Sequence, residues 1–273
     1  MNQQVLLIND LAGYGKVALS AMIPIMSYMG INLQNLPTAL VSNTLDYGKF
    51  DILDTTDYMK NTLKVWHELG FKFDAVATGF ICNETQAKII NEYCHHASSN
   101  GALILCDPIM GDEGQLYPGM DQTCVNNMAK IVSCADYIVP NFTEATFLTN
   151  HSYSVTPSDE EIKTIIDDLR KMGAKSVIIT SVVQNDKFMV CCYDSKLNEY
   201  FNLEYENIPV RIPGTGDIFS SSLLGSLLNG ASLKDSVSKA MKIVEKMIIL
   251  NMHNQDLYKG IEIESCLKEI DHA

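Results

Sequence analysis

The sequence has 273 residues, of which 47% are hydrophobic and 19% are charged. This composition supplies enough apolar side chains for one large core and excludes a disordered chain. Twenty lysines and arginines against 33 acidic residues give a net charge of −13, which disfavours binding to nucleic acid or to an anionic membrane surface. We therefore expect one globular domain over residues 1–273, with no nucleic acid and no membrane among its partners.

The chain carries no pattern for export or for membrane insertion. The longest apolar stretches, such as residues 17–29, contain Ser and Pro and fall short of the roughly 20 residues that a membrane-spanning helix needs. The N-terminus lacks the basic region and the cleavage site of a signal peptide. The eight cysteines include no Cys-x-x-Cys pair, so we expect reduced core thiols rather than disulfides or zinc ligands. These features predict a cytoplasmic protein.

Short apolar runs alternate with longer stretches of helical periodicity along the chain. The runs typical of strands buried on both faces are residues 5–8, 75–78, 102–106, 137–139 and 176–180. The alternation predicts an α/β fold, a three-layer α/β/α sandwich with a mostly parallel central sheet. The β-rich residues 187–192 and 199–203 are separated by a polar link, which predicts a hairpin at one edge of that sheet.

The clearest predicted helix ends at Gly173. Thr156 can cap its N-terminus, Pro157 suits the first turn, and the acidic residues that follow favour the positive end of the helix dipole. Its apolar residues recur at helical spacing. Two further helices are expected near the C-terminus, over about 217–228 and 233–250.

Gly13 and Gly15 follow the first predicted strand and, with Ala18, formally match a dinucleotide-binding G-x-G-x-x-G/A fingerprint. No acidic residue ends a second strand at the distance that this site requires, and Lys16 does not stand in the frame of a phosphate-binding P-loop. We therefore interpret the segment as a tight turn between a strand and a helix.

The segment Gly214-Thr215-Gly216-Asp217 immediately precedes a helical pattern. Its glycines allow backbone N–H groups to converge at the helix N-terminus, a geometry suited to developing negative charge. An aspartate beside that anion pocket is ionised at neutral pH and can accept a proton from a substrate hydroxyl. The structural alternative is a glycine-rich turn in which Asp217 only stabilises the start of the helix.

Two acidic segments also follow predicted strands. Asp107 and Asp112 lie where ligands bind in open α/β sheets, and carboxylates are ligands for a hard divalent ion; an Asp-Pro turn is the structural alternative. Asn141 and Glu144 have the spacing of a helix capping box. Together with the glycine-rich turn, these segments supply the metal ligands, the anion pocket and the base that phosphoryl transfer from a Mg-nucleotide requires.

These motifs, in this order, resemble those of the ribokinase superfamily and, within it, of the pyridoxal/pyridoxamine kinases. The matching segments are Asn9-Asp10, Gly13–Lys16, Pro37–Asn43, Thr78–Phe80, Asp107–Asp112, Pro140–Glu144, Ile179–Ser181 and Gly214–Asp217. The resemblance implies a homodimeric kinase that uses ATP and Mg²⁺ to phosphorylate the 5′-hydroxymethyl group of a B6 vitamer, either pyridoxal, pyridoxamine or pyridoxine. It also leaves room for a monovalent cation such as K⁺.

The resemblance assigns roles to three sets of residues. The catalytic set is Asp217 as general base, with the backbone of Gly214, Thr215 and Gly216 as the anion hole. The substrate-binding set is Asp10, Ser42, Phe80 and Asp217. The nucleotide-binding set is Asp107, Val139, Asn141, Glu144, Thr180, Gly214 and Gly216, in which Asp107 and Glu144 are the metal ligands.

Two departures from the family pattern leave the preferred vitamer open. Many relatives have Ser-Asn-His-Thr where this chain has Ser42-Asn43-Thr44-Leu45, so the polar contacts expected there are changed. Phe80 stands where many relatives have Tyr; it can stack on the pyridine ring but cannot donate a hydroxyl hydrogen bond.

Other functions remain as alternatives. A hydroxymethylpyrimidine kinase of thiamine synthesis shares the fold and the terminal turn, although Met110–Tyr117 resembles the vitamin B6 branch. Sugar kinases of the superfamily carry a Gly-Gly pair near the sugar, and this chain contains none. A non-catalytic protein that binds a B6 vitamer needs no base, so the intact Gly214–Asp217 turn argues against it.

Overall fold

The computed structural model describes residues 3–273, and their contacts group them into two compact units. Unit 1 comprises residues 3–75 and 208–273, and unit 2 comprises residues 76–207. The prediction of a single domain over residues 1–273 concerns how the two units combine and stays a prediction.

Unit 1 contains three adjacent strands. β1 (Gln4–Ala12) and β2 (Asn32–Val41) are parallel, and β3 (Ile52–Asp54) pairs antiparallel with the end of β2. Residues 5–8 are fully buried, which confirms the first predicted strand. Patterning did not predict β2, because polar residues and a proline interrupt its apolar run.

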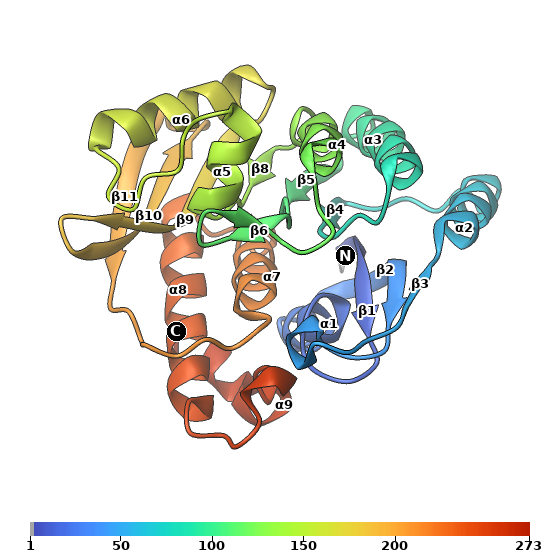
Figure 1. Cartoon of the computed structure of the whole chain (residues 1–273). Coiled ribbons are helices and arrows are strands. Elements are labelled where there is room, and N and C mark those ends of the chain that lie inside the picture. Colours follow the sequence, from blue (N-terminus) through green and yellow to red (C-terminus); the bar gives the residue numbers. More distant parts are fainter. Residues whose placement is uncertain (1–2) are drawn as a thin grey trace. The chain divides into compact units, whose positions relative to one another are not determined.

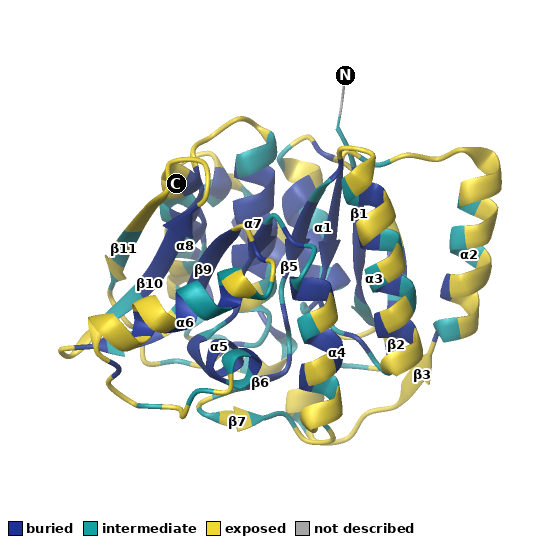
Figure 2. Ribbon diagram, turned by 90° about the horizontal axis from the view of Figure 1, so that it is seen from above, coloured by how far each residue is buried: buried dark blue, intermediate teal, exposed yellow. Residues whose placement is uncertain are grey.

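The helices of unit 1 form a second layer. α1 (Leu19–Tyr28) packs against β1, β2 and α7 (Thr215–Leu228), and α7 packs against α8 (Leu233–Asn251). α7 and α8 confirm the two helices predicted near the C-terminus. The remaining helical segments are η1 (Leu45–Tyr47), α2 (Thr56–Leu69), η2 (Leu257–Lys259), α9 (Ile263–Cys266) and η3 (Leu267–Ile270). Most of α2 is exposed, and only Met59 of that helix is buried (Figure 2).

Unit 2 contains six strands in the order β11-β10-β9-β8-β5-β4. Their bounds are β4 (Ala75–Thr78, whose first residue ends the N-terminal segment of unit 1), β5 (Leu103–Cys106), β8 (Tyr137–Ile138), β9 (Ser176–Gln184), β10 (Lys187–Asp194) and β11 (Glu199–Tyr205). β5, β8 and β9 are parallel, whereas β10 is antiparallel to both of its neighbours. The predicted strands and the hairpin at the sheet edge are therefore confirmed.

Four helices lie over one face of these strands (Figure 1). They are α3 (Glu84–Ser99), α4 (Gln122–Val132), α5 (Phe142–Thr149) and α6 (Asp159–Lys171). A separate two-stranded hairpin, β6 (Gly111–Asp112) and β7 (Gln115–Leu116), contacts α5. This arrangement places the loops that follow β5 and β8 beside the start of α5.

The start of α6 differs from the prediction. Ser158, not Thr156, is the N-cap: its Oγ accepts the Glu161 N–H at 3.2 Å, and the Glu161 carboxylate accepts the Ser158 N–H at 2.7 Å. Thr156 and Pro157 precede the helix. The cap moves to Ser158 because Ser and a Glu three residues later satisfy two backbone N–H groups at once.

Among residues 3–273, no helix combines the length and the apolar character needed to cross a lipid bilayer. All eight cysteines lie in this described range and are free thiols.

Candidate active site

Unit 1 brings Asp10 and Asp217 together at the end of β1 and the first turn of α7. Asp217 Oδ2 accepts the backbone N–H of Ala18 at 2.8 Å, and Asp217 Oδ1 accepts Nδ2 of Asn9 at 3.4 Å. The sequence analysis assigned no role to Asn9 or Ala18. The one signal in the sequence for Asn9 was its place beside Asp10 in the Asn9-Asp10 segment that matches the kinase family.

The two carboxyl groups of this pair are both hard to ionise. Burial raises the pKa of Asp217 to about 6, and the hydrogen bonds from Ala18 and Asn9 oppose that rise. Burial, and after it the charge of Asp217, raises the pKa of Asp10 to about 7. The pKa of Asp217 is the lower of the two, because its carboxylate accepts the hydrogen bonds from Ala18 and Asn9. Asp217 is thus a proton acceptor at neutral pH.

The Gly214 turn forms the N-terminus of α7. Gly214 is the N-cap and has a φ of +87°, and a Cβ at this position would lie 2.1 Å from the Lys16 carbonyl oxygen. Ile218 donates the first helical hydrogen bond, to the Gly214 carbonyl at 3.0 Å. The N–H groups of Thr215 and Gly216 therefore lie outside the helical ladder, at the positive end of the helix dipole. An anion can bind there.

The loop after β1 is the tight turn that the sequence analysis expected. The N–H groups of Gly13 and Tyr14 donate to carbonyls at the end of β2 at 2.7 and 3.0 Å, and the Lys16 N–H donates to the Lys259 carbonyl at 2.8 Å. Because the protein itself uses these donors, they do not cradle a phosphate. The prediction of a tight turn between a strand and a helix is confirmed.

Ser42 lies in the exposed turn between β2 and β3. Its Oγ donates to Asn43 Oδ1 at 2.7 Å and accepts the Asp51 N–H at 2.9 Å. Both hydrogen bonds hold the hydroxyl within this turn.

Unit 2 brings together Asn141, Glu144 and Thr180. Asn141 and Glu144 form the expected capping box of α5: Glu144 N–H donates to Asn141 Oδ1, and Asn141 N–H donates to Glu144 Oε2, each at 2.9 Å. Thr180, on β9, forms a β-bridge with Asn141, in which its N–H donates to the Pro140 carbonyl at 3.0 Å. The capping interpretation of this segment is confirmed.

Glu144 also holds the segment that follows β5. Its Oε1 accepts the Met110 N–H at 2.9 Å, and the side chain is only 4% exposed. Burial raises the pKa of Glu144 well above its ordinary value, and the charge of Asp107 raises it further. The carboxyl groups of Asp107 and Glu144 are therefore close enough to repel each other. A cation beside them would relieve this repulsion.

The Gly111–Gly119 segment contains the β6–β7 hairpin. Its turn residues Glu113 and Gly114 both have positive φ values, 50° and 78°, as a two-residue hairpin turn requires. The Gly114 N–H donates to Thr143 Oγ1 at 2.8 Å, and Asn141 Nδ2 donates to the Gly111 carbonyl at 2.7 Å. Both bonds tie the hairpin to the start of α5.

The remaining predicted residues of unit 2 also follow strands. Val139 is buried directly after β8, and Phe80 is half-buried two residues after β4.

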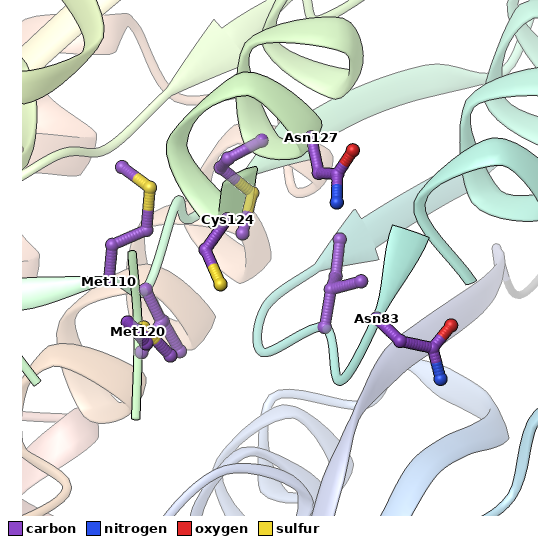
Figure 3. A pocket seen from close by; sticks show the side chains of 8 residues that line it. Asn83, Met110, Met120, Cys124 and Asn127 are labelled. Carbon is purple, nitrogen blue, oxygen red and sulfur yellow. The ribbon is translucent and has the colours of Figure 1, made fainter. Parts of the chain in front are cut away.

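A small apolar cavity of unit 2 lies beside the Asp107–Asp112 segment (Figure 3). Its lining residues are Ile81, Asn83, Ile109, Met110, Met120, Cys124, Asn127 and Met128. The volume of about 20 Å³ accommodates a water molecule. In this structure the cavity is too small for a pyridine ring or a nucleotide.

The fold and the acidic strand ends define an α/β kinase of the ribokinase-like class, and comparisons with known proteins agree. The profile described as "Phosphomethylpyrimidine kinase" matches residues 25–262. The chain belongs to the phosphomethylpyrimidine kinase family.

The names of individual relatives refer to two substrates, pyridoxal and phosphomethylpyrimidine. The pyridoxal kinase of Dictyostelium discoideum is 28% identical over 93% of this chain and 88% of its own length. The crystal structure, with pyridoxal, of a candidate phosphomethylpyrimidine kinase from Bacteroides thetaiotaomicron is 34% identical, with a TM-score of 0.94 over 99% of this chain and 96% of that chain. Pyridoxal kinase from Lactobacillus plantarum is 27% identical, with a TM-score of 0.88 over 98% and 96% of the two chains.

Proposed function

We propose that the protein transfers the γ-phosphoryl group of ATP to the 5′-hydroxymethyl group of a B6 vitamer. The observation that carries this proposal is the half-buried carboxylate of Asp217, which accepts hydrogen bonds from Ala18 and Asn9 in the first turn of α7 and has its pKa raised to about 6 by desolvation. The names of the relatives and the pyridoxal in the Bacteroides crystal support the substrate.

In the proposed reaction, Asp217 accepts the proton of the hydroxymethyl group while the oxygen of that group attacks the γ-phosphorus; the bond from this phosphorus to the β–γ bridging oxygen breaks, and ADP leaves. The backbone N–H groups of the Gly214, Thr215 and Gly216 turn stabilise the charge that develops on the transferred group. Asp10, half-buried and with a pKa of about 7, can form a hydrogen bond with the polar edge of the pyridine ring. Ser42 and Phe80 complete the proposed substrate set, in which Phe80 stacks on the ring.

We assign the nucleotide to Asp107, Val139, Asn141, Glu144, Thr180 and the Gly214–Gly216 turn. Mg²⁺ suits the two repelling carboxylates of Asp107 and Glu144, since it prefers carboxylate and phosphate oxygens. Among residues 3–273, no group of three or more His, Cys, Asp or Glu side chains gathers for a metal. In kinases the nucleotide phosphates supply the other ligands, and the ion neutralises their charge. A monovalent cation such as K⁺ is a further candidate cofactor.

The Glu144→Gln substitution tests the metal assignment. The amide cannot take on the negative charge that a carboxylate ligand of Mg²⁺ carries, and it turns one acceptor oxygen into a donor that faces a backbone N–H. We expect the Mg²⁺ concentration for half-maximal rate to rise about tenfold, with a smaller change in the KM for the vitamer. The variant should also lose about 1–3 kcal/mol of stability, because a buried N–H loses its acceptor. An unchanged Mg²⁺ dependence with the stability loss would leave Glu144 as a capping residue only.

ATP consumption by the purified protein tests the proposed function. Pyridoxal, pyridoxamine, pyridoxine and hydroxymethylpyrimidine are compared in parallel with Mg²⁺. Turnover of a B6 vitamer is the expected result. Turnover of the pyrimidine alone would make the protein a hydroxymethylpyrimidine kinase, the activity for which a 26% identical Aquifex aeolicus relative is named. Tight vitamer binding without turnover would indicate a non-catalytic protein.

We further propose that the chain is one ribokinase-like domain that acts in the cytoplasm as a homodimer. Large apolar side chains of β2, β3 and α2 are exposed, among them Leu40 at 41%, Leu53 at 60% and Leu69 at 62%. A second copy of the chain would cover this surface. Sedimentation of the purified protein measures its mass, and a monomer at micromolar concentration would contradict the dimer.

A further inference from the structure

We propose that Asn9 is a positioning residue that, with the backbone N–H of Ala18, holds and orients the carboxylate of Asp217. This inference rests on the proposed function, in which Asp217 is the base. It goes further because it identifies what keeps that base ionised and directed within unit 1.

The direction of the Asn9 side chain is fixed by its neighbours. Asn9 is 2% exposed, and its Oδ1 accepts the Asp10 N–H at 3.0 Å. Since an N–H can bond only to the oxygen of the carboxamide, the amide nitrogen must point the other way. There Nδ2 lies 3.4 Å from Asp217 Oδ1 and 3.6 Å from Met22 Sδ. The donor aimed at Asp217 is therefore set by the backbone of β1.

The second donor depends on a strained backbone. Ala18, the N-cap of α1, has a φ of 48° and a ψ of −132°, a conformation that residues with a Cβ rarely adopt. Its carbonyl accepts the N–H groups of Ala21 and Met22 at 3.0 and 2.9 Å, so the helix start holds it in place. The Ala18 N–H is thereby directed at Asp217 Oδ2, at 2.8 Å. Asn9 and Ala18 thus donate to different oxygens of the carboxylate.

Among residues 3–273, no cationic side chain contributes to the pKa shift of Asp217. Asp10 on β1 is the ionisable group that repels Asp217, and α1 and α7 contain no other charged residue. Lys16, on the loop after β1, pairs with Glu264. The charged residues of α8 are exposed or half-exposed. The hydrogen bonds from Ala18 and Asn9, together with the backbone N–H of Asp217 itself, favour the ionised form of Asp217.

The test removes the Asn9 donor and follows the titration of Asp217. Asn9→Leu deletes the carboxamide at similar size, and Asn9→Ser deletes it with a smaller polar side chain should the leucine variant not fold. We expect the acid limb of kcat/KM for the vitamer to move up by roughly one pH unit. The loss of rate should therefore be about fivefold greater at pH 6 than at pH 8.5. Met22→Leu, which removes only the sulfur contact of Asn9, is the matched control and should leave the limb in place.

A second readout does not need turnover. The stability difference between each protein and its Asp217→Asn counterpart, followed against pH, reports the titration of Asp217 directly. The pH range over which this stability difference changes should also shift to higher pH in the Asn9 variants. If the wild type phosphorylates no vitamer, the proposed function fails while this readout still decides the role of Asn9. An acid limb and a stability window that both coincide with those of the wild type would overturn the inference.

Discussion

The Asp217→Asn variant is expected to lose turnover by about 10²- to 10⁴-fold, because asparagine has nearly the same size but cannot accept the substrate proton. Steady-state rates with ATP and the preferred vitamer measure the loss. ATP affinity should stay within about twofold, because the amide neither adds nor removes volume at the turn. Asp235→Asn, the same substitution on α8, is the control and should keep the wild-type rate. A wild-type rate in Asp217→Asn at saturating substrate would remove the role of base from this residue.

The same substitution has an expected effect on stability with a definite sign. The folded-state pKa of Asp217 is about 6 against an ordinary value of 3.8, so the folded protein binds more protons than the unfolded chain between these values. Stability therefore falls as the pH rises through this window. At pH 8 we expect Asp217→Asn to be more stable than the wild type by on the order of 1 kcal/mol. Urea unfolding should show this difference shrinking as the pH falls from about 6 to about 4 and staying constant below that.

Gly214→Ala is expected to cause the second large effect, on both stability and turnover. Alanine pays about 1–2 kcal/mol for the left-handed conformation, and its Cβ would lie 2.1 Å from the Lys16 carbonyl. Backbone displacement to relieve that contact adds about 1–3 kcal/mol. Since the same displacement moves the N–H groups of the proposed anion hole, kcat should fall by roughly 10²-fold.

Substitutions at two other glycines distinguish the cost of the left-handed conformation from the cost of the contact with Lys16. Gly230 also has a positive φ, 90°, but open space around it, so Gly230→Ala measures the conformational cost alone. Gly216 has neither a positive φ nor a neighbour within 4 Å, so Gly216→Ala should leave stability unchanged or slightly increased. Urea unfolding of the three variants gives the comparison. If Gly214→Ala were no less stable than Gly230→Ala, the contact with Lys16 would carry no cost.

Local patterns sufficed for the elements in which burial is uniform along the chain. The strands at 5–8 and 75–78 are short apolar runs, and α7 and α8 follow helical periodicity. These elements can therefore be predicted from the pattern of their own residues. The capping box of Asn141 and Glu144 could also be predicted from the sequence, because its two partners are three residues apart. The start of α6 was misplaced from Ser158 to Thr156 since both residues can cap, and the choice depends on the reciprocal bond to Glu161.

The sequence by itself determined the fold class, the family resemblance and which acidic segments follow strands. Only the tertiary structure decided what surrounds Asp217, because its partner Asn9 lies 208 positions away in the chain. The same holds for Gly214, whose glycine requirement comes from the carbonyl of Lys16. Neither local propensity nor periodicity encodes such contacts. They arise when distant segments are packed together, and burial then raises the pKa of a carboxyl group that looks ordinary in the sequence.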